Sequence, residues 1–133
     1  MDYRFGSYPT MITPYNADGS VDYATAEKYV EWYAKGGCDG IFAVCQSSEM
    51  FYLSLKERVK LAETTVQAVK ESGYAMSVVA SGHISEEIEA QAEEITAIAQ
   101  TGVDSVVLVS NRLDLHHDGD KVKKKNAEVL LSK

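Results

Sequence analysis

The stretch Gly37-Cys38-Asp39-Gly40-Ile41-Phe42-Ala43-Val44 joins the end of one predicted element to the start of another. Its first glycine is a residue that commonly closes a helix. The apolar run that follows is continuous rather than alternating, which predicts a strand covered on both faces, as in a parallel sheet. The stretch Gly102-Val103-Asp104-Ser105-Val106 repeats the order of glycine, aspartate and strand. The repeat predicts helices that alternate with parallel strands.

Outward from these joints, apolar runs alternate with helical patterns along the whole chain. The predicted strands are residues 8–13, 40–45, 76–81 and 105–110. Asp22, Ser54 and Ser85 precede the helical patterns between them and are predicted N-caps. Ser54 is followed three residues later by Glu57, which fits a capping box, and a fourth helix is predicted to begin near residues 118–121. Units of this kind predict one α/β domain over residues 1–133, built from βαβ crossovers.

Ligands of such folds bind at the carboxyl ends of the strands, whether the sheet is open or closed into a barrel. Here those ends are residues 45–51, 81–83 and 110–115, together with residues 13–15. No glycine-rich phosphate loop follows any strand, which argues against nucleotide binding. Periodicity leaves two architectures open, a flavodoxin-like doubly wound sheet and part of a barrel.

Composition limits the partners. The 133 residues carry 20 acids against 13 bases, a net charge of −7, which argues against nucleic acid. Lys121, Lys123, Lys124 and Lys125 are interpreted as a solvated helix face or a loose tail. No apolar run approaches the length that crosses a bilayer, and residues 1–5 lack the pattern of a signal peptide. With only Cys38 and Cys45, we expect reduced thiols, a cytoplasmic location and no membrane partner.

Several motifs, in register over the whole chain, resemble the dihydrodipicolinate synthase and N-acetylneuraminate lyase family. The opening Tyr8-Pro9-Thr10-Met11-Ile12-Thr13-Pro14-Tyr15 is one, and the others are residues 36–41, 53–58, 81–82 and 102–104. Members of this family are (β/α)8-barrels. The resemblance therefore implies that the chain is the N-terminal half of a TIM barrel, (βα)4, with parallel strands.

The resemblance also implies a chemistry. Members form a Schiff base between a lysine and pyruvate or another 2-keto acid, without a metal or other cofactor. The lysine and a tyrosine that assists it lie on the sixth and fifth strands of the family, beyond Lys133. We therefore expect a truncated member of a lyase (aldolase) family that is inactive alone, so whether this chain is itself an enzyme stays open.

The predicted substrate-binding residues are Gln46, Ser47, Ser48 and Arg112. Cys45-Gln46-Ser47-Ser48-Glu49 matches the family loop that binds the carboxylate of the keto acid. Ser47 keeps a hydroxyl of that loop, and the N–H groups of Ser47 and Ser48 are expected to face an anion. Gln46 replaces a threonine of the family's hydroxyl relay. Arg112 lies where many members carry a tyrosine, and it is expected to bind a carboxylate or phosphate.

Other polar residues are given structural roles. Glu49 is expected to be hydrogen-bonded within the turn, Cys45 to be a small buried thiol, and His83 to be a loop histidine. Adjacent side chains point apart, so His116 and His117 are not expected to bind a metal. Two further functions stay open beside the lyase. One is a non-catalytic half-barrel that binds a small carboxylate or a partner chain, and the other is a flavodoxin-like binding module.

An open half-barrel predicts self-association, because strand edges and an apolar inner face are left uncovered. That inner face is expected to be formed by the side chains of Met11, Ile41, Ala43, Val78 and Val107 or their neighbours. A second copy can cover it through a two-fold contact. We therefore expect a homodimer or a tetramer built from dimers.

Overall fold

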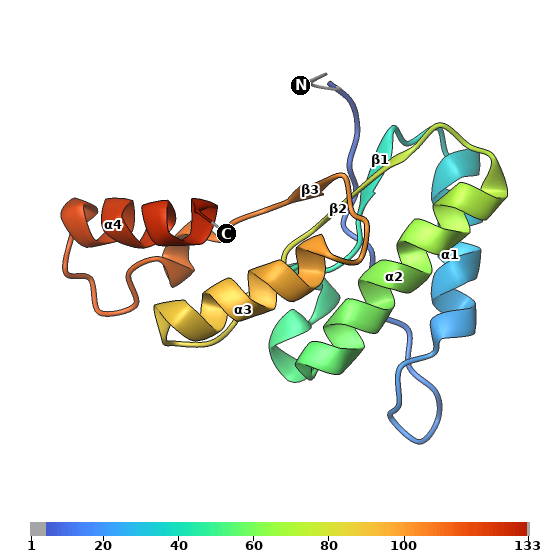
Figure 1. Ribbon diagram of the computed structural model, residues 1–133. Coiled ribbons are helices and arrows are strands. Elements are labelled where there is room, and N and C mark those ends of the chain that lie inside the picture. Colours follow the sequence, from blue (N-terminus) through green and yellow to red (C-terminus); the bar gives the residue numbers. More distant parts are fainter. Residues whose placement is uncertain (1–4, 133) are drawn as a thin grey trace.

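Residues 5–132 are described in a computed structural model of the chain (Figure 1), and most of the N-terminal stretch tested above for a signal peptide lies outside them. The elements, in chain order, are α1 (Tyr23–Lys35), β1 (Gly40–Phe42), η1 (Gln46–Ser48), η2 (Met50–Tyr52), α2 (Leu55–Ser72), β2 (Ser77–Ala80), α3 (Ile88–Ala99), β3 (Ser105–Val106), η3 (Ser110–Arg112) and α4 (Asp120–Leu131). Elements labelled η are short 3₁₀ helices. None of the helices in the described part is both long and apolar enough to cross a membrane.

The sheet has the strand order β1-β2-β3, and each strand runs parallel to the next. Ile41 pairs with Val78, and Ala80 pairs with Val106. Strands that follow one another in the chain are thus neighbours in the sheet, as in a (β/α)8-barrel. A flavodoxin-like sheet places its second strand outside its first. The parallel half-barrel is confirmed, and the doubly wound alternative is wrong.

The first predicted strand, residues 8–13, is right in position and direction but wrong in extent. Its chain lies parallel to β1 through a single bridge between Thr10 and Phe42. The Phe42 N–H donates to the Pro9 carbonyl at 2.9 Å, and the Met11 N–H donates to the Phe42 carbonyl at 2.9 Å. Proline has no N–H to donate, so Pro9 cannot extend the ladder.

The caps of α1 and α2 are confirmed. The Asp22 carboxylate accepts from the Thr25 N–H at 3.0 Å, and Ser54 and Glu57 form both bonds of a capping box. Ser85, however, does not cap α3. That helix begins at Ile88 without a side-chain cap, and the Ser85 hydroxyl donates to Glu94 at 3.0 Å instead.

The predicted inner face is wrong for Met11, Ile41, Ala43 and Val78, because the alternation of the strands places them on the other side, whereas Val107 does lie on the open side with Thr10 and Phe42. Met11, Ile41 and Ala43 are completely buried, and with Val78 they pack in one core against the helices. Figure 1 shows α1 and α2 together on one side of the strands. The opposite face includes Phe42, which pairs with Thr10 and Val79 and is partly exposed. A continuous apolar run does not reveal which of its residues face the helices.

Candidate functional site

The segments that follow β1, β2 and β3 meet at the carboxyl edge of the sheet. A cavity of about 190 Å³ lies on the face away from the helix-packed core. It is lined by Thr10, Phe42, Cys45, Gln46, Ser47, Val107, Leu108 and Val109. Two of the predicted binding residues, Gln46 and Ser47, therefore share one cavity, whereas Ser48 and Arg112 are not part of its lining.

The cavity has one polar wall and one apolar wall. Gln46 and Ser47 begin η1, the next element after β1, and their side chains are exposed. The Val107–Val109 segment lies opposite them, after β3. None of the lining residues carries a formal charge at neutral pH. An amide and two hydroxyls beside apolar side chains can orient a small carboxylate by hydrogen bonds, but the lining holds no strong acid or base.

Ser48 is a structural part of the turn. It is completely buried, and its hydroxyl donates to the Met11 carbonyl at 2.5 Å. The Thr13 hydroxyl donates to the Ser48 carbonyl at 2.6 Å, and the Ser48 N–H donates to the Cys45 carbonyl at 3.1 Å. The expectation that this N–H faces an anion is therefore wrong. Ser48 ties η1 to the segment before α1 and so fixes the turn that presents Ser47.

Glu49 follows in the left-handed region, with φ of 60°, and its backbone connects η1 to η2. Its carboxylate is exposed. Partial burial and the nearby Glu49 carboxylate raise the pKa of Tyr15 to about 12. Tyr15 therefore stays protonated at any physiological pH. Cys45 is buried beside this turn, as predicted, with its Sγ 3.2 Å from the Ser48 hydroxyl.

Arg112 is held against a neighbouring turn. Its Nη2 donates to the Ile84 carbonyl and, at 3.1 Å, to the Ser85 carbonyl. Its guanidinium lies 5.5 Å from the centre of the Phe51 ring, so it reaches the segment that follows η1. Arg112 therefore lies at the same edge of the sheet as Ser47 but joins the η3 segment to the turn after β2.

A buried ion pair that the sequence pattern did not indicate lies behind this edge. The Arg58 Nη2 lies 3.1 Å from the Glu94 carboxylate, and both side chains are more than nine-tenths buried. Glu94 also accepts from the N–H groups of Ile84 and Ser85, at 2.7 and 3.1 Å. Burial raises the pKa of Glu94, but these N–H groups and Arg58 together hold that pKa below its usual value.

His83 lies in the loop after β2, as predicted, and its ring forms a buried bridge there. It is completely buried, with Nδ1 2.8 Å from the Gln91 side-chain oxygen. The Val109 N–H donates to its Nε2 at 2.8 Å. Burial lowers the pKa of His83. One signal was available in the sequence, because Gln91 and Glu94 lie three residues apart among the apolar positions of the α3 pattern.

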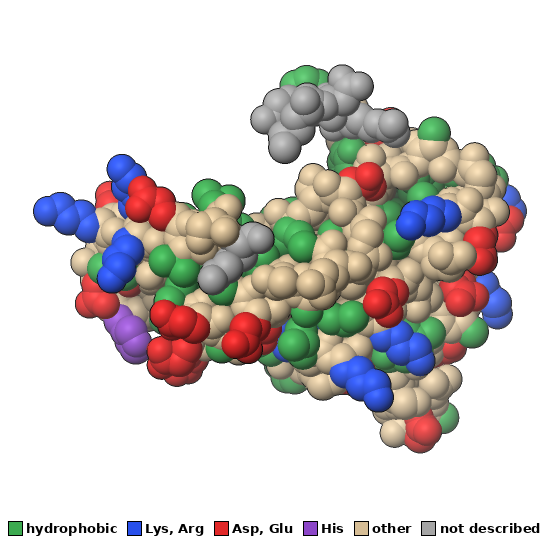
Figure 2. Space-filling model, in the orientation of Figure 1, with side chains coloured by type: hydrophobic (Ala, Val, Ile, Leu, Met, Phe, Trp, Pro, Cys, Tyr) green, Lys and Arg blue, Asp and Glu red, His purple; other side chains and the backbone are tan. Residues whose placement is uncertain are grey.

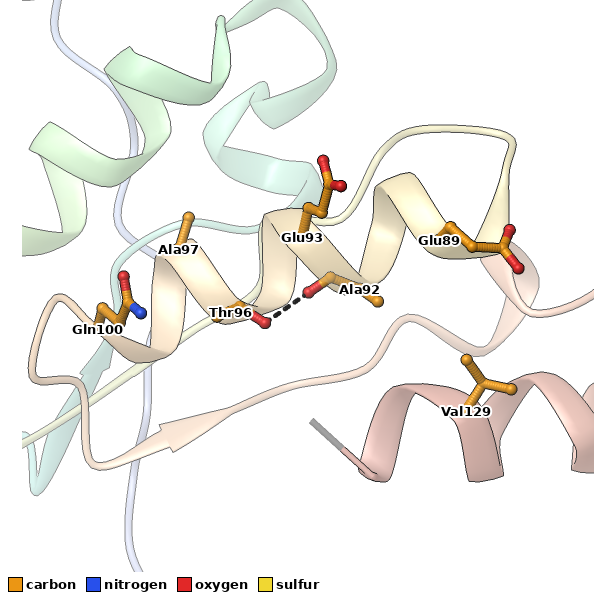
Figure 3. Close-up of a pocket in the computed structure, with 7 residues that line it drawn as sticks. All are labelled: Glu89, Ala92, Glu93, Thr96, Ala97, Gln100 and Val129. Atoms are coloured by element: carbon orange, nitrogen blue, oxygen red, sulfur yellow. Dashed lines mark hydrogen bonds between the residues drawn. The ribbon is translucent and has the colours of Figure 1, made fainter.

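A larger groove, of about 590 Å³, lies between α3 and α4 (Figure 3) and is less suited to chemistry. Its lining is Glu89, Ala92, Glu93, Thr96, Ala97, Gln100 and Val129. The Thr96 hydroxyl there donates to the Ala92 carbonyl of its own helix. The groove contains no predicted site residue and lies away from the strand ends. Within residues 5–132 no acids, histidines and cysteines group as metal ligands, and Lys121–Lys125 is exposed on α4, at the far end of the molecule in Figure 2.

Comparisons with known proteins agree with this architecture. The family model described as "Dihydrodipicolinate synthetase family" matches residues 4–111. A 4-hydroxy-tetrahydrodipicolinate synthase of Saccharophagus degradans is 33% identical over 106 residues, which cover 79% of this chain and 35% of that protein. A dihydrodipicolinate synthase structure from Bacillus anthracis superposes with a TM-score of 0.81 at 22% identity, over 97% of this chain and 42% of its own.

An N-acetylneuraminate lyase structure from Mycoplasma synoviae superposes with a TM-score of 0.65 at 22% identity, over 76% of this chain and 34% of its own. The chain thus spans less than half the length of each of these relatives.

Proposed function

Because the chain belongs to the dihydrodipicolinate synthetase family, we propose that the cavity at the strand ends binds the carboxylate of a small 2-keto acid such as pyruvate. The observation that carries the proposal is the cavity that Gln46 and Ser47 share at the carboxyl edge of the sheet. This is the edge at which barrels of this kind bind their ligands. The loop also matches the family's carboxylate loop in position.

Each predicted site residue has a distinct part in the proposal. The Ser47 hydroxyl and the Gln46 side-chain amide each donate a hydrogen bond to the carboxylate. Ser48 acts through the turn, because its hydroxyl is already bonded to Met11. Arg112 receives a second carboxylate or a phosphate of a longer substrate, since its guanidinium lies beside Phe51 at the same edge.

Binding is tested by calorimetric titration with pyruvate. The Ser47→Ala variant is expected to weaken binding about tenfold or more, because a hydrogen bond to a charged group contributes roughly 1.5–3 kcal/mol. Ser105→Ala is the matched control, since Ser105 is exposed where β3 begins, away from the carboxyl edge. Equal affinity in the two variants would reject Ser47 as a ligand.

Within the family, a Schiff-base lyase or aldolase is the reaction class that we propose for the whole barrel. The 133 residues by themselves are proposed to bind without catalysis. No lysine lies on a described strand, and the Schiff-base nucleophile must be an amine of lowered pKa. Incubation with pyruvate and borohydride, followed by intact mass measurement, is expected to leave the mass unchanged. A stable adduct on one lysine would overturn this proposal.

Two finer statements belong with this proposal. We propose a cytoplasmic location, supported by two cysteines that are both unpaired in the described residues. We also propose a homo-oligomer, dimer or tetramer, that covers the open face on which Phe42 lies and where Ile12 is 56% exposed. Sedimentation equilibrium at micromolar concentration tests the assembly, and a well-folded 14.6 kDa monomer would reject it.

A further inference from the structure

Beyond β2 and β3, a side chain takes the place of a backbone carbonyl as a hydrogen-bond acceptor in the ladder. The Asp104 N–H donates to the Val78 carbonyl, and the Val107 N–H donates to the Ala80 carbonyl, both at 2.8 Å. In a parallel ladder the next partner of the Val109 N–H is the Gly82 carbonyl. That carbonyl instead accepts from the Arg58 guanidinium, and the Val109 N–H donates to Nε2 of His83.

The ring of His83 therefore takes the place of a backbone carbonyl at the wall of the cavity. An acceptor at Nε2 requires a neutral ring with its proton on Nδ1, and that proton is donated to the Gln91 side-chain oxygen. The Gln91 amide in turn donates to the Arg112 carbonyl at 3.1 Å. The wall from Val107 to Val109 is thus joined to α3 through one imidazole, and the first turn beyond it is joined to α3 through the Gln91 amide.

We propose that His83 is a positioning residue for the cavity, whose neutral ring fixes the Val107–Val109 wall and whose protonation on Nε2 releases it. A proton on Nε2 would point a donor at the Val109 N–H, and the bond would be lost. The inference rests on the proposed function only for the identity of the ligand. The contact itself is a property of the fold.

Burial favours the neutral form of the ring, and the charged groups around it act in both directions. Burial lowers the pKa of His83 most, and the charges of Arg112 and Arg58 lower it further. The Gln91 bond and the Glu94 carboxylate act in the other direction. Glu94, however, already accepts from Arg58, Ile84 and Ser85, so it has little capacity left to stabilise an imidazolium.

The test uses the chain with His116→Gln and His117→Gln, because both of those histidines are exposed and His83 is then the last of three. NMR of the ring nitrogens is expected to show the Nδ1–H tautomer at neutral pH. The Val107–Val109 amides are expected to shift together with the ring as the pH falls below about 6.5, the ordinary pKa of histidine, because burial lowers the pKa of His83. A further His83→Gln substitution, which keeps an acceptor and removes the titration, is expected to abolish that shift.

Pyruvate affinity over the same range separates positioning from simple charge. A new positive charge near the cavity would strengthen binding of an anion. Release of the wall is expected to weaken it, by about three- to tenfold for one lost hydrogen bond, and only while His83 is present. Stronger binding in acid, an Nε2–H tautomer, or wall amides that titrate without His83 would each overturn the proposal.

The outcomes also separate this inference from the proposed function. If the wall amides follow His83 but pyruvate never binds, the function is wrong and the positioning role stands. If pyruvate binds equally well throughout and the wall does not move, the function stands and the positioning role is wrong. Should His83→Gln fail to fold, the ring tautomer and the pH profile of the double variant still decide the question.

Discussion

Around β1 and β2 the chain is stabilised by apolar packing, whereas around β3 and α4 it is stabilised largely by buried polar contacts. The first region shares one continuous core in which residues such as Ile41, Leu61 and Ala80 are completely buried. The buried apolar cluster of the second region is Ala92, Ile95 and Leu130, and β3 is two residues long.

In the second region, hydrogen bonds and an ion pair join segments that its small apolar cluster does not hold together. Glu94 joins α3 to Arg58 of α2, and Asp114 accepts from the N–H groups of Asp118 and Gly119 at 2.8 and 2.9 Å, before α4 begins. The stability from hydrophobic burial does not depend on protonation. The stability from an ion pair does, because its carboxylate must be ionised. The second region should therefore be the more sensitive to single polar substitutions and to acid.

The largest expected change in the free energy of unfolding is that of Glu94→Ala. It leaves Arg58 charged, buried and without its carboxylate, a change that typically destabilises by about 3–5 kcal/mol. The pKa of Glu94 is lowered in the fold, so its contribution is present above the pKa of an unfolded carboxyl group and is lost as pH falls. Urea denaturation of the variant should therefore show a smaller deficit in acid.

Glu93→Ala is the matched control for Glu94→Ala, since Glu93 is exposed on the same helix. Its effect on the free energy of unfolding should lie within about 0.5 kcal/mol of zero. Similar deficits for the two variants would mean that the buried ion pair does not stabilise the second region.

The next effect is that of Leu61→Ala in the first region. Leu61 is completely buried, and truncation of such a side chain costs about 2–5 kcal/mol through lost transfer energy and the cavity left behind. Unlike the Glu94 deficit, this one should not change with pH. Leu131→Ala is the control, because Leu131 is 75% exposed. A deficit that varies with pH as strongly as that of Glu94→Ala would remove the distinction between the two regions.

A smaller effect is expected at the start of α2. Ser54 and Glu57 form a complete capping box there, so Ser54→Ala should destabilise by about 1 kcal/mol. Thermal unfolding followed by circular dichroism measures the loss. No change in Tm would show that other contacts already fix the start of this helix.

The smallest effect has the opposite sign. α3 has Glu87 at its N-cap, without a side-chain bond to the helix. Serine is among the preferred residues at this position, so Glu87→Ser is expected to stabilise by roughly 0.5 kcal/mol. The same thermal measurement decides it, and a lower Tm would mean that the exposed Glu87 carboxylate stabilises the helix more than a cap would.

The two regions also differ in how far the sequence predicted them. Periodicity and caps placed α1, β1, α2 and β2, because those elements follow local rules that Asp22 and Ser54 obey. The family resemblance placed Gln46 and Ser47 at one site. Neither could show that Ser85 bonds to Glu94 rather than capping α3, or that His83 accepts from Val109. Those contacts join residues 9 and 26 positions apart, and only the folded chain brings them together.

The cavity lies where the two regions meet, with Gln46 and Ser47 from the first and Val107–Val109 from the second. The most direct test is therefore a pyruvate titration of the ¹⁵N-labelled chain, followed residue by residue. The account predicts that chemical-shift changes centre on residues 46–50 and extend to residues 107–109, and that Ser47→Ala raises the pyruvate concentration needed for both by about tenfold or more. Shifts confined to the exposed Lys121–Lys125 segment would show charge attraction alone and would contradict a carboxylate site at the strand ends.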